Sequence, residues 1–358
     1  MKLLMITRKV DKDDDRAGFI CGWIKKISQR VEKLTVICLE KGNLSGLKGI
    51  TIYSLGKEEY LSYPHFIRRL ITLYRFYKYI WQLRKEYESV FVHMHSIYVI
   101  LAGCLWRLWG KKIGLWCAHI KVNTSAKAAS YLVDYIFSPS KESFSFATKK
   151  LKEVGHGIDT QVFKPLDYPR DKRGKWQIIS IGRISLVKDY DTLIKAVKIL
   201  VNQYQFDNFE VKIIGQPARQ EDFEYLKRLK EKIKKYHLDK YFHWLGGASH
   251  REVVKFYQRA DIFVNMQAGG GFGKSVLEAM TCGLVCILCT PVYKKILGDY
   301  QKETIFEEKN PQSMAEKINK VVTWSPEKYN HYQVLMRDYV VRNHNLDNLI
   351  DKIISFYE

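Results

Sequence analysis

The feature that most constrains this chain is an alternation of short apolar segments with longer helix-forming ones, which occurs in two successive series. In the first series, the apolar segments lie at 3–7, 34–39, 50–55, 90–94, 112–118 and 135–140. In the second series, they lie at 177–182, 211–215, 242–246, 261–266 and 284–289. Such alternation predicts βαβ units around mostly parallel sheets. We therefore expect an α/β fold with two facing, Rossmann-like (doubly wound) domains.

The intervening segments predict the helices and the domain boundaries. Helical stretches are expected at 18–30, 64–86 and 97–109, after 140, at 220–236, from about 274, and at 346–357. The segment FKPLDYPRDKRGKW has no periodicity, and its prolines, glycine and clustered charges are typical of a linker. We expect a first domain over 1–165, a linker over 166–176 and a second domain over 177–345. Sheets of this kind bind ligands outside the carboxyl ends of their strands, which points to the cleft between the two domains.

The charge is strongly positive and unevenly distributed. The chain has 59 Lys and Arg against 38 Asp and Glu, a net charge of +21. Residues 1–165 alone contain 28 Lys and Arg against 14 Asp and Glu. This excess predicts an anionic partner, which can be a phosphorylated substrate, an acidic lipid or nucleic acid. The chain contains no recognised nucleic-acid-binding motif, so nucleic acid is not the expected partner.

Several features indicate a cytoplasmic protein with reduced thiols. The longest apolar run, Ile97–Trp106, is far shorter than the about 20 residues that a membrane-spanning helix needs. The apolar start of the chain is too short for the core of a signal peptide. Seven cysteines, an odd number, then indicate thiols rather than disulfides.

The segment QAGGGFGKSVLEAMTCGLVCILCT, residues 267–290, carries the clearest chemical signal. An apolar strand ends in a run of glycines, and a helix starts near Lys274. Such a turn presents backbone N–H groups and a positive helix end to an anion, and glycine lets a phosphate approach closely. Lys274 and Ser275 would add two side-chain donors. The segment therefore predicts a phosphate-binding loop.

Three other interpretations of nearby residues compete with this one. Ala268–Ser275 fits a relaxed P-loop pattern, AxxxxGKS, although no convincing Walker B strand follows. Cys282, Cys286 and Cys289 have a spacing compatible with an iron–sulfur cluster, but an apolar strand of this kind favours buried thiols. The pair His93 and His95 lacks a third candidate ligand, so no metal site is expected.

The glycine-rich segment resembles the signature of the retaining glycosyltransferases of family 4, which have the GT-B fold. That signature combines a Glu, Gly-Phe-Gly and a second Glu in an E-x7-E element, followed by Ala-Met-x-x-Gly. The residues that match it are Gly271, Phe272, Gly273, Glu278, Ala279, Met280 and Gly283. Upstream, Gly182, Arg183 and Lys188 are similar to the family's Gly-Arg-x4-Lys element. GHGIDTQVFKP, residues 155–165, is similar to its interdomain element.

The resemblance implies an enzyme that transfers a hexose-type sugar from a nucleotide diphosphate sugar to a hydroxyl acceptor with retention of configuration. It implies no metal and no tightly bound cofactor. The second domain would bind the donor and the basic first domain the acceptor, with the helix at 346–357 crossing back onto the first domain. A lipid-linked glycan or a precursor of a cell-surface polysaccharide is one class of acceptor that fits.

The resemblance also implies the roles of individual residues. Arg183 and Lys188 would neutralise the diphosphate leaving group, and fixed cations there would stabilise charge that develops in the transition state. Glu278 would accept the ribose hydroxyls, a role that suits a carboxylate. His119 would face the donor sugar, and Gly18 would lie in a loop near the diphosphate. The loop residues expected to bind the donor are Gly271, Phe272, Gly273, Lys274 and Ser275.

One position departs from the family pattern. The first Glu of the E-x7-E element would fall at position 270, where this chain has Gly270. In the family that carboxylate contacts the donor sugar. The departure leaves two alternatives beside the P-loop: a different donor sugar, or a non-catalytic homologue with the same fold.

The segment at 64–88 is basic, aromatic and amphipathic. Apolar residues recur at helical spacing at Phe66, Leu70, Leu73, Tyr77, Ile80 and Trp81, with arginines and lysines between them. Such a helix can lie in a lipid interface against anionic headgroups. A core-packed helix with a basic outer face is the alternative. The first interpretation predicts a peripheral protein on the cytosolic face of a membrane, with Tyr77 and Trp81 inserted.

Overall fold

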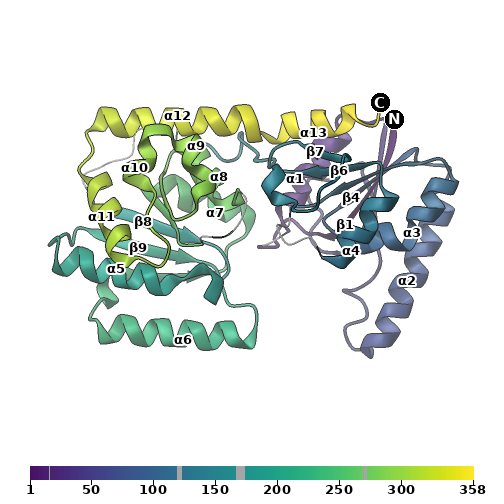
Figure 1. Cartoon of the computed structure of the whole chain (residues 1–358). Helices are drawn as coiled ribbons and strands as arrows, with labels where there is room; N and C mark the ends of the chain where they lie inside the picture. Colours follow the sequence, from purple (N-terminus) through teal and green to yellow (C-terminus); the bar gives the residue numbers. More distant parts are fainter. Residues whose placement is uncertain (16, 119–122, 167–173, 268, 270–271) are drawn as a thin grey trace. The chain divides into compact units, whose positions relative to one another are not determined.

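The structure is a computed structural model that describes the chain except residues 16, 119–122, 167–173, 268 and 270–271 (Figure 1). It divides into two compact units, Met1–Asp159 with His344–Glu358, and Thr160–Asn343. Residues 160–165, which the sequence analysis placed in the first domain, lie in the second unit. There the Phe163 ring packs edge-on against the rings of His250 and Tyr257.

The described part of the first unit contains a seven-stranded parallel sheet with the order β3-β2-β1-β4-β5-β6-β7. Its strands are β1 Lys2–Val10, β2 Lys33–Lys41, β3 Thr51–Ser54, β4 Ser89–His93, β5 Lys112–Trp116, β6 Tyr135–Ser138 and β7 Leu151–Glu153. Its helices are α1 Phe19–Ser28, α2 His65–Gln82, α3 Ser96–Leu108, α4 Thr124–Leu132 and α13 Leu346–Ser355.

Helices cover both faces of this sheet, as a doubly wound fold requires. The core on one face joins the sheet to α1 and α13 through residues such as Trp23 and Ile350. The core on the other face joins it to α2, α3 and α4 through residues such as Phe76, Trp106 and Ala129. The central strands β1, β4 and β5 are buried on both sides, which explains why they read as continuous apolar runs.

The sequence analysis was wrong about the segment after β6. It predicted a helix after residue 140, but the chain forms a short 3-10 turn at Lys141–Ser143 and then β7. Phe144 and Phe146 are two residues apart and cannot share one helix face, and Phe144 is buried in the core. The helix α4, which the sequence analysis did not anticipate, buries Ala126 and Ala129, residues too small to give a clear apolar pattern.

The described part of the second unit contains a five-stranded parallel sheet with the order β10-β9-β8-β11-β12. Its strands are β8 Trp176–Ile181, β9 Phe209–Ile214, β10 Phe242–Gly246, β11 Ile262–Asn265 and β12 Val285–Leu288. Its helices are α5 Tyr190–Asn202, α6 Gln220–Lys235, α7 His250–Arg259, α8 Lys274–Thr281, α9 Lys294–Leu297, α10 Gln301–Thr304, α11 Pro311–Val322 and α12 Pro326–His344. The strand order reverses between β8 and β11, which makes their carboxyl ends the switch point where such sheets bind ligands.

Across the described residues, no helix combines the length and the apolar character that crossing a membrane requires.

The helix α13 lies on the first unit beside α1, although the whole second unit separates the two in sequence (Figure 1). Its buried side chains are Leu346, Leu349, Ile350, Ile353 and Ile354. The Asn345 side chain caps its first turn by accepting from the Asp347 and Asn348 backbone N–H groups. Arg30, just after the end of α1, pairs with Asp347 at 2.8 Å. Both apolar burial and ion pairs thus hold α13 in place.

We predict that Ile353→Ala lowers the free energy of unfolding of the first unit by about 2–5 kcal/mol, because it leaves a cavity in a fully buried position. Hydrogen exchange of the β1 and β4 amides in a urea titration reports this unit alone. The exposed neighbour Ser355→Ala is the matched control and should leave exchange unchanged. Equal protection in the Ile353→Ala variant would contradict the assignment of α13 to this core.

Candidate functional site

The carboxyl ends of β8 and β9 approach each other more closely than residues with side chains allow. Gly182 donates its N–H to the Ile214 carbonyl at 3.0 Å. A Cβ on Gly215 would lie 1.9 Å from the Gly182 carbonyl oxygen, and both glycines have φ of +149°. Only glycine combines that backbone angle with that proximity. The turn that follows β8 is therefore held at a fixed place on the sheet edge.

Arg183 and Lys188 extend from this turn. Arg183 is exposed directly after Gly182, and Lys188 ends a 3-10 turn at Leu186–Lys188. The Lys188 side chain lies over Gly182, where its Cε would be 3.2 Å from an added Cβ. Burial lowers the pKa of the Lys188 ammonium, and the positive charge of Arg183 lowers it further. Neither cation forms an ion pair with a carboxylate of the described residues.

The glycine-rich loop joins β11 to α8, and the structure describes only part of it. Ala268, Gly270 and Gly271 lie outside the described residues. Gly273 donates its N–H to the hydroxyl of Tyr293 at 2.6 Å, and Phe272 packs edge-on against the Tyr293 ring. Tyr293 is itself buried. The end of the loop is therefore anchored to the core through a tyrosine that the sequence analysis did not identify.

Lys274 and Ser275 occupy the first turn of α8 and are both partly buried. The Lys274 ammonium lies 3.7 Å from the Glu278 carboxylate one turn along the same helix. The P-loop interpretation requires a lysine and backbone N–H groups that reach the phosphates of a nucleotide. Lys274 instead pairs with Glu278, and the Gly273 N–H is bonded to Tyr293. The geometry therefore does not favour a P-loop.

Glu278 is the centre of a buried polar network. Its side chain is 7% exposed, and its Oε1 lies 3.4 Å from His250 Nε2. Its Oε2 accepts the Tyr257 hydroxyl at 3.2 Å. Burial favours the protonated form, but the hydrogen bond with His250 and the charge of Lys274 outweigh it and lower the pKa of the Glu278 carboxyl. The network thus holds an ionised carboxylate inside the second unit.

Sequence reasoning identified Glu278 but missed His250 and Tyr257. These two residues are seven positions apart on α7, which places them on one face of that helix. That spacing is the sequence signal that could have grouped His250 with Tyr257. Nothing in the sequence shows that their face of α7 points at α8.

The remaining predicted site residues are distributed differently. His119 and Gly271 lie outside the described residues. Gly18 immediately precedes α1 in the first unit, where its N–H donates to the Asp14 carbonyl at 3.0 Å. Within the described ranges, no group of His, Cys, Asp and Glu is arranged to hold a metal ion. Cys286 and Cys289 are buried, and burial raises the pKa of the Cys289 thiol to about 12.

The helix α2 exposes much of the apolar face that the sequence analysis identified. It buries Phe76 and Ile80, whereas Phe66, Leu70 and Trp81 are exposed. Tyr77 is different, because it packs against the core and donates its hydroxyl to the Leu101 carbonyl at 2.9 Å. Tyr77 is therefore held within the first unit, and its insertion into a lipid interface stays a prediction.

Comparison with known families agrees with this arrangement. Residues 168–334 match the model of the family Glycosyl transferases group 1. Mannosylfructose-phosphate synthase of Agrobacterium fabrum is 26% identical over 150 residues, which are 40% of this chain and 33% of that protein. D-inositol 3-phosphate glycosyltransferase of an Arthrobacter species is 28% identical over 148 residues, 40% of this chain and 33% of that protein. The chain thus aligns with about a third of the length of these relatives.

Solved structures show the same fold over the whole chain. Anabaena HepE in complex with UDP and glucose superposes with a TM-score of 0.77 at 14% identity, covering 99% of both chains. Sucrose-phosphate synthase from Thermosynechococcus elongatus gives 0.73 at 13% identity, covering 100% of this chain and 98% of that one. The two parallel-sheet units thus have the GT-B architecture of glycosyltransferases. The segment that matches the group 1 glycosyl transferases lies within the second unit.

The Glu278 network predicts a specific dependence of stability on pH. The pKa of Glu278 is lower in the folded protein than the ordinary value of 4.5. Its contribution is therefore fully present above the unfolded pKa and is lost as the pH falls through the folded pKa. Glu278→Gln should cost about 1–3 kcal/mol at neutral pH, because its buried partners lose the carboxylate. The deficit should shrink on acidification below a pH of about 4.5.

Urea midpoints measured across that pH range check this expectation. The exposed carboxylate of α6 in Glu231→Gln is the matched control, and its acid profile should follow that of the wild type. A constant deficit in Glu278→Gln at every pH would show that packing, not ionisation, is the contribution of this side chain.

Proposed function

We propose that the protein is a glycosyltransferase that transfers a sugar from a nucleotide diphosphate sugar to a hydroxyl acceptor with retention of configuration. The observation that carries the proposal is the pair of cations, Arg183 and Lys188, next to the close-packed carboxyl ends of β8 and β9. The similarity of residues 168–334 to the group 1 glycosyl transferases supports it independently.

The chemistry of the leaving group matches this cation pair. Cleavage of the bond between sugar and diphosphate leaves negative charge on the diphosphate, and preorganised cations stabilise charge where it develops. Burial and the nearby charge of Arg183 both lower the pKa of Lys188, so they disfavour its positive charge. A bound diphosphate compensates that charge, so the same contact that orients the donor also promotes its cleavage.

Glu278 supplies a complementary contact in the proposed donor site. An ionised carboxylate has about four acceptor positions on its two oxygens. His250 and Tyr257 each use one position, which leaves acceptor capacity for the two ribose hydroxyls of a nucleotide. We assign His250 and Tyr257 to orienting this carboxylate. His119 and Gly271 keep their proposed roles beside the donor sugar, and both lie outside the described residues.

The first unit offers a surface suited to an acceptor at a membrane. The helix α2 contains no Asp or Glu, and it exposes Phe66 and Leu70 beside Arg69. Exposed apolar side chains beside unopposed cations match the interface of an anionic bilayer. We propose that this face associates peripherally with the cytosolic face of a membrane and that the acceptor is lipid-linked.

The cation pair gives a direct test of the transfer reaction. Arg183→Ala and Lys188→Ala should each lower kcat/KM by about 10²–10³, because each removes one preorganised donor at the diphosphate. Donor hydrolysis or transfer, measured with a panel of nucleotide sugars, identifies the donor first. Lys195→Ala, an exposed lysine of α5 away from the sheet edge, is the matched control.

Wild-type rates in both variants would refute the role of the cation pair. A wild-type protein that neither binds nor turns over any nucleotide sugar would instead favour the non-catalytic homologue suggested by Gly270.

The α2 face predicts salt-sensitive binding to anionic vesicles and little binding to neutral ones. The attraction should weaken as the Debye length falls from ~10 Å at 0.1 M salt to ~3 Å at 1 M. Phe66→Ser combined with Leu70→Ser should reduce binding, since both side chains are more than 60% exposed and contribute little to the core. Phe223→Ser combined with Val334→Ser, two exposed apolar residues of the second unit, is the control in co-sedimentation assays.

Equal partitioning of the wild type to neutral and anionic vesicles, or none to either, would overturn the proposed membrane association.

A further inference from the structure

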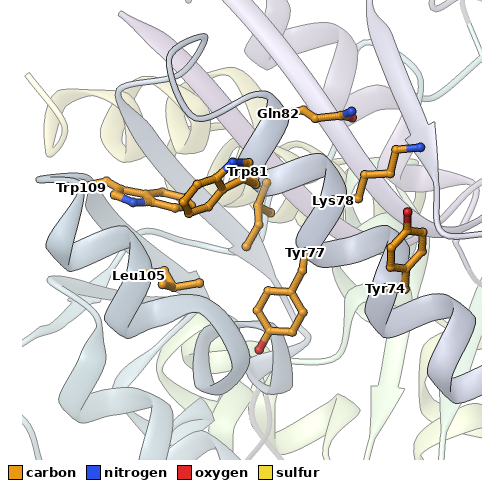
Figure 2. A pocket seen from close by; sticks show the side chains of 8 residues that line it. Tyr74, Tyr77, Lys78, Trp81, Gln82, Leu105 and Trp109 are labelled. Carbon is orange, nitrogen blue, oxygen red and sulfur yellow. The ribbon is translucent and has the colours of Figure 1, made fainter.

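A groove separates α2 from α3 on the surface of the first unit, and Figure 2 shows the side chains that line it. Its volume is about 470 Å³, within the usual range for pockets that bind small molecules. The residues on which its chemistry depends are Tyr74, Tyr77, Lys78, Trp81, Leu105 and Trp109. None of them is among the residues assigned to the proposed donor site.

The interior of the groove is hydrocarbon and aromatic. Trp81 and Trp109 meet edge to face with ring centroids 5.7 Å apart, and they form one end of the groove (Figure 2). Tyr77 presents its ring, because its hydroxyl is bonded to the Leu101 carbonyl on α3. Leu105 adds an aliphatic wall. Sugar hydroxyls or a peptide backbone would find few hydrogen-bond partners here, whereas a hydrocarbon chain needs none.

The rim of the groove is positively charged. Lys78 lies at the end away from the tryptophan pair (Figure 2), is exposed and forms no ion pair among the described residues. The Arg84 guanidinium lies over the Trp81 ring, 4.6 Å from its centroid. Neither α2 nor α3 contains an Asp or Glu. A positively charged rim attracts an anion. A hydrocarbon chain with an anionic head therefore matches both the apolar interior and the charged rim of the groove.

We infer that the groove between α2 and α3 binds one hydrocarbon chain of a phosphate-bearing membrane lipid, with the phosphate at Lys78 and the chain running between Tyr77 and Leu105 toward Trp81 and Trp109. This inference rests on the proposed membrane-facing role of α2. It goes further than that role. A groove that withdraws one hydrocarbon chain from the bilayer binds one lipid per protein, whereas exposed side chains that adsorb to headgroups have no fixed stoichiometry.

Dodecyl phosphate, used as a monomer below its critical micelle concentration, is the probe, and titration calorimetry is the measurement. We expect saturable one-to-one binding. Inorganic phosphate, which lacks the chain, should show no measurable binding. Dodecyl maltoside, which has the same chain and no charge, should bind about fivefold more weakly, in line with the loss of one lysine contact to an anion. Lys78→Ala should weaken dodecyl phosphate binding by a similar factor, and Lys85→Ala, an exposed lysine outside the groove, should not.

Two variants test the position of the chain. Leu105→Phe fills the groove from within and should weaken dodecyl phosphate binding at least about tenfold, since the chain loses most of its buried area. Trp81→Ala removes one wall by truncation at an exposed position and should act in the same direction, which guards against a misfolded Leu105→Phe protein. Leu108→Phe, on the exposed side of α3, is the matched control. Thermal unfolding verifies that each variant is folded.

The outcomes separate this inference from the proposed membrane association. Loss of dodecyl phosphate binding in Leu105→Phe and Trp81→Ala, with retention in Leu108→Phe, supports the groove. Wild-type protein that binds anionic vesicles but not dodecyl phosphate overturns the groove and leaves the membrane association intact. Equal binding of dodecyl phosphate to all variants also overturns it. Absence of vesicle binding together with one-to-one dodecyl phosphate binding would refute the membrane association and support the groove.

Discussion

The close approach of β8 and β9 is the constraint on which the proposed donor site depends. A side chain at Gly215 would collide with the Gly182 carbonyl and displace the turn that carries Arg183 and Lys188. Lys188 in turn lies over Gly182, where the absence of a Cβ leaves room for the lysine at the sheet edge. Two glycines on neighbouring strands thus place two like charges together at a defined position. The cost of that repulsion is what an anionic ligand removes.

The buried network around Glu278 supplies the second group of polar contacts in the proposed site. Glu278 is buried and ionised because His250, Tyr257 and Lys274 surround it with donors. Burial alone would favour a protonated carboxyl, and the donors reverse that preference. Tyr293 fixes the end of the loop before α8, because its hydroxyl accepts the Gly273 N–H. Side chains from α7 and from the segment after β12 therefore fix the groups that the glycine-rich segment presents.

Much of the fold and part of the candidate site were predictable from the sequence. The predictions that failed did so for physical reasons. Most strands of both units are buried runs of Val, Ile and Leu, and the glycine-rich turn has a strong local signature, so their places were predicted within a few residues. The short and less buried β7 was not predicted. The contributions of three residues, His250, Tyr257 and Tyr293, were not predicted, because each acts through a contact between elements that are distant along the chain.

Periodicity identified the apolar face of α2, but it did not predict that this face is exposed. The same spacing of Phe66 and Leu70 describes a helix packed inward or one turned to solvent, and only the sheet's position decides between them.

The packing of α13 has a consequence for the order in which this protein can be assembled on a ribosome. Synthesis proceeds from the N-terminus, and domains generally fold as they emerge. Yet the core that joins β1, β2 and α1 also contains Leu349, Ile350 and Ile353, which are translated after the whole of the second unit. The residues of Thr160–Asn343 can complete their own core while the earlier unit still exposes an apolar face. A chaperone therefore has the most reason to engage the nascent chain during this interval, at the first unit and not at the second.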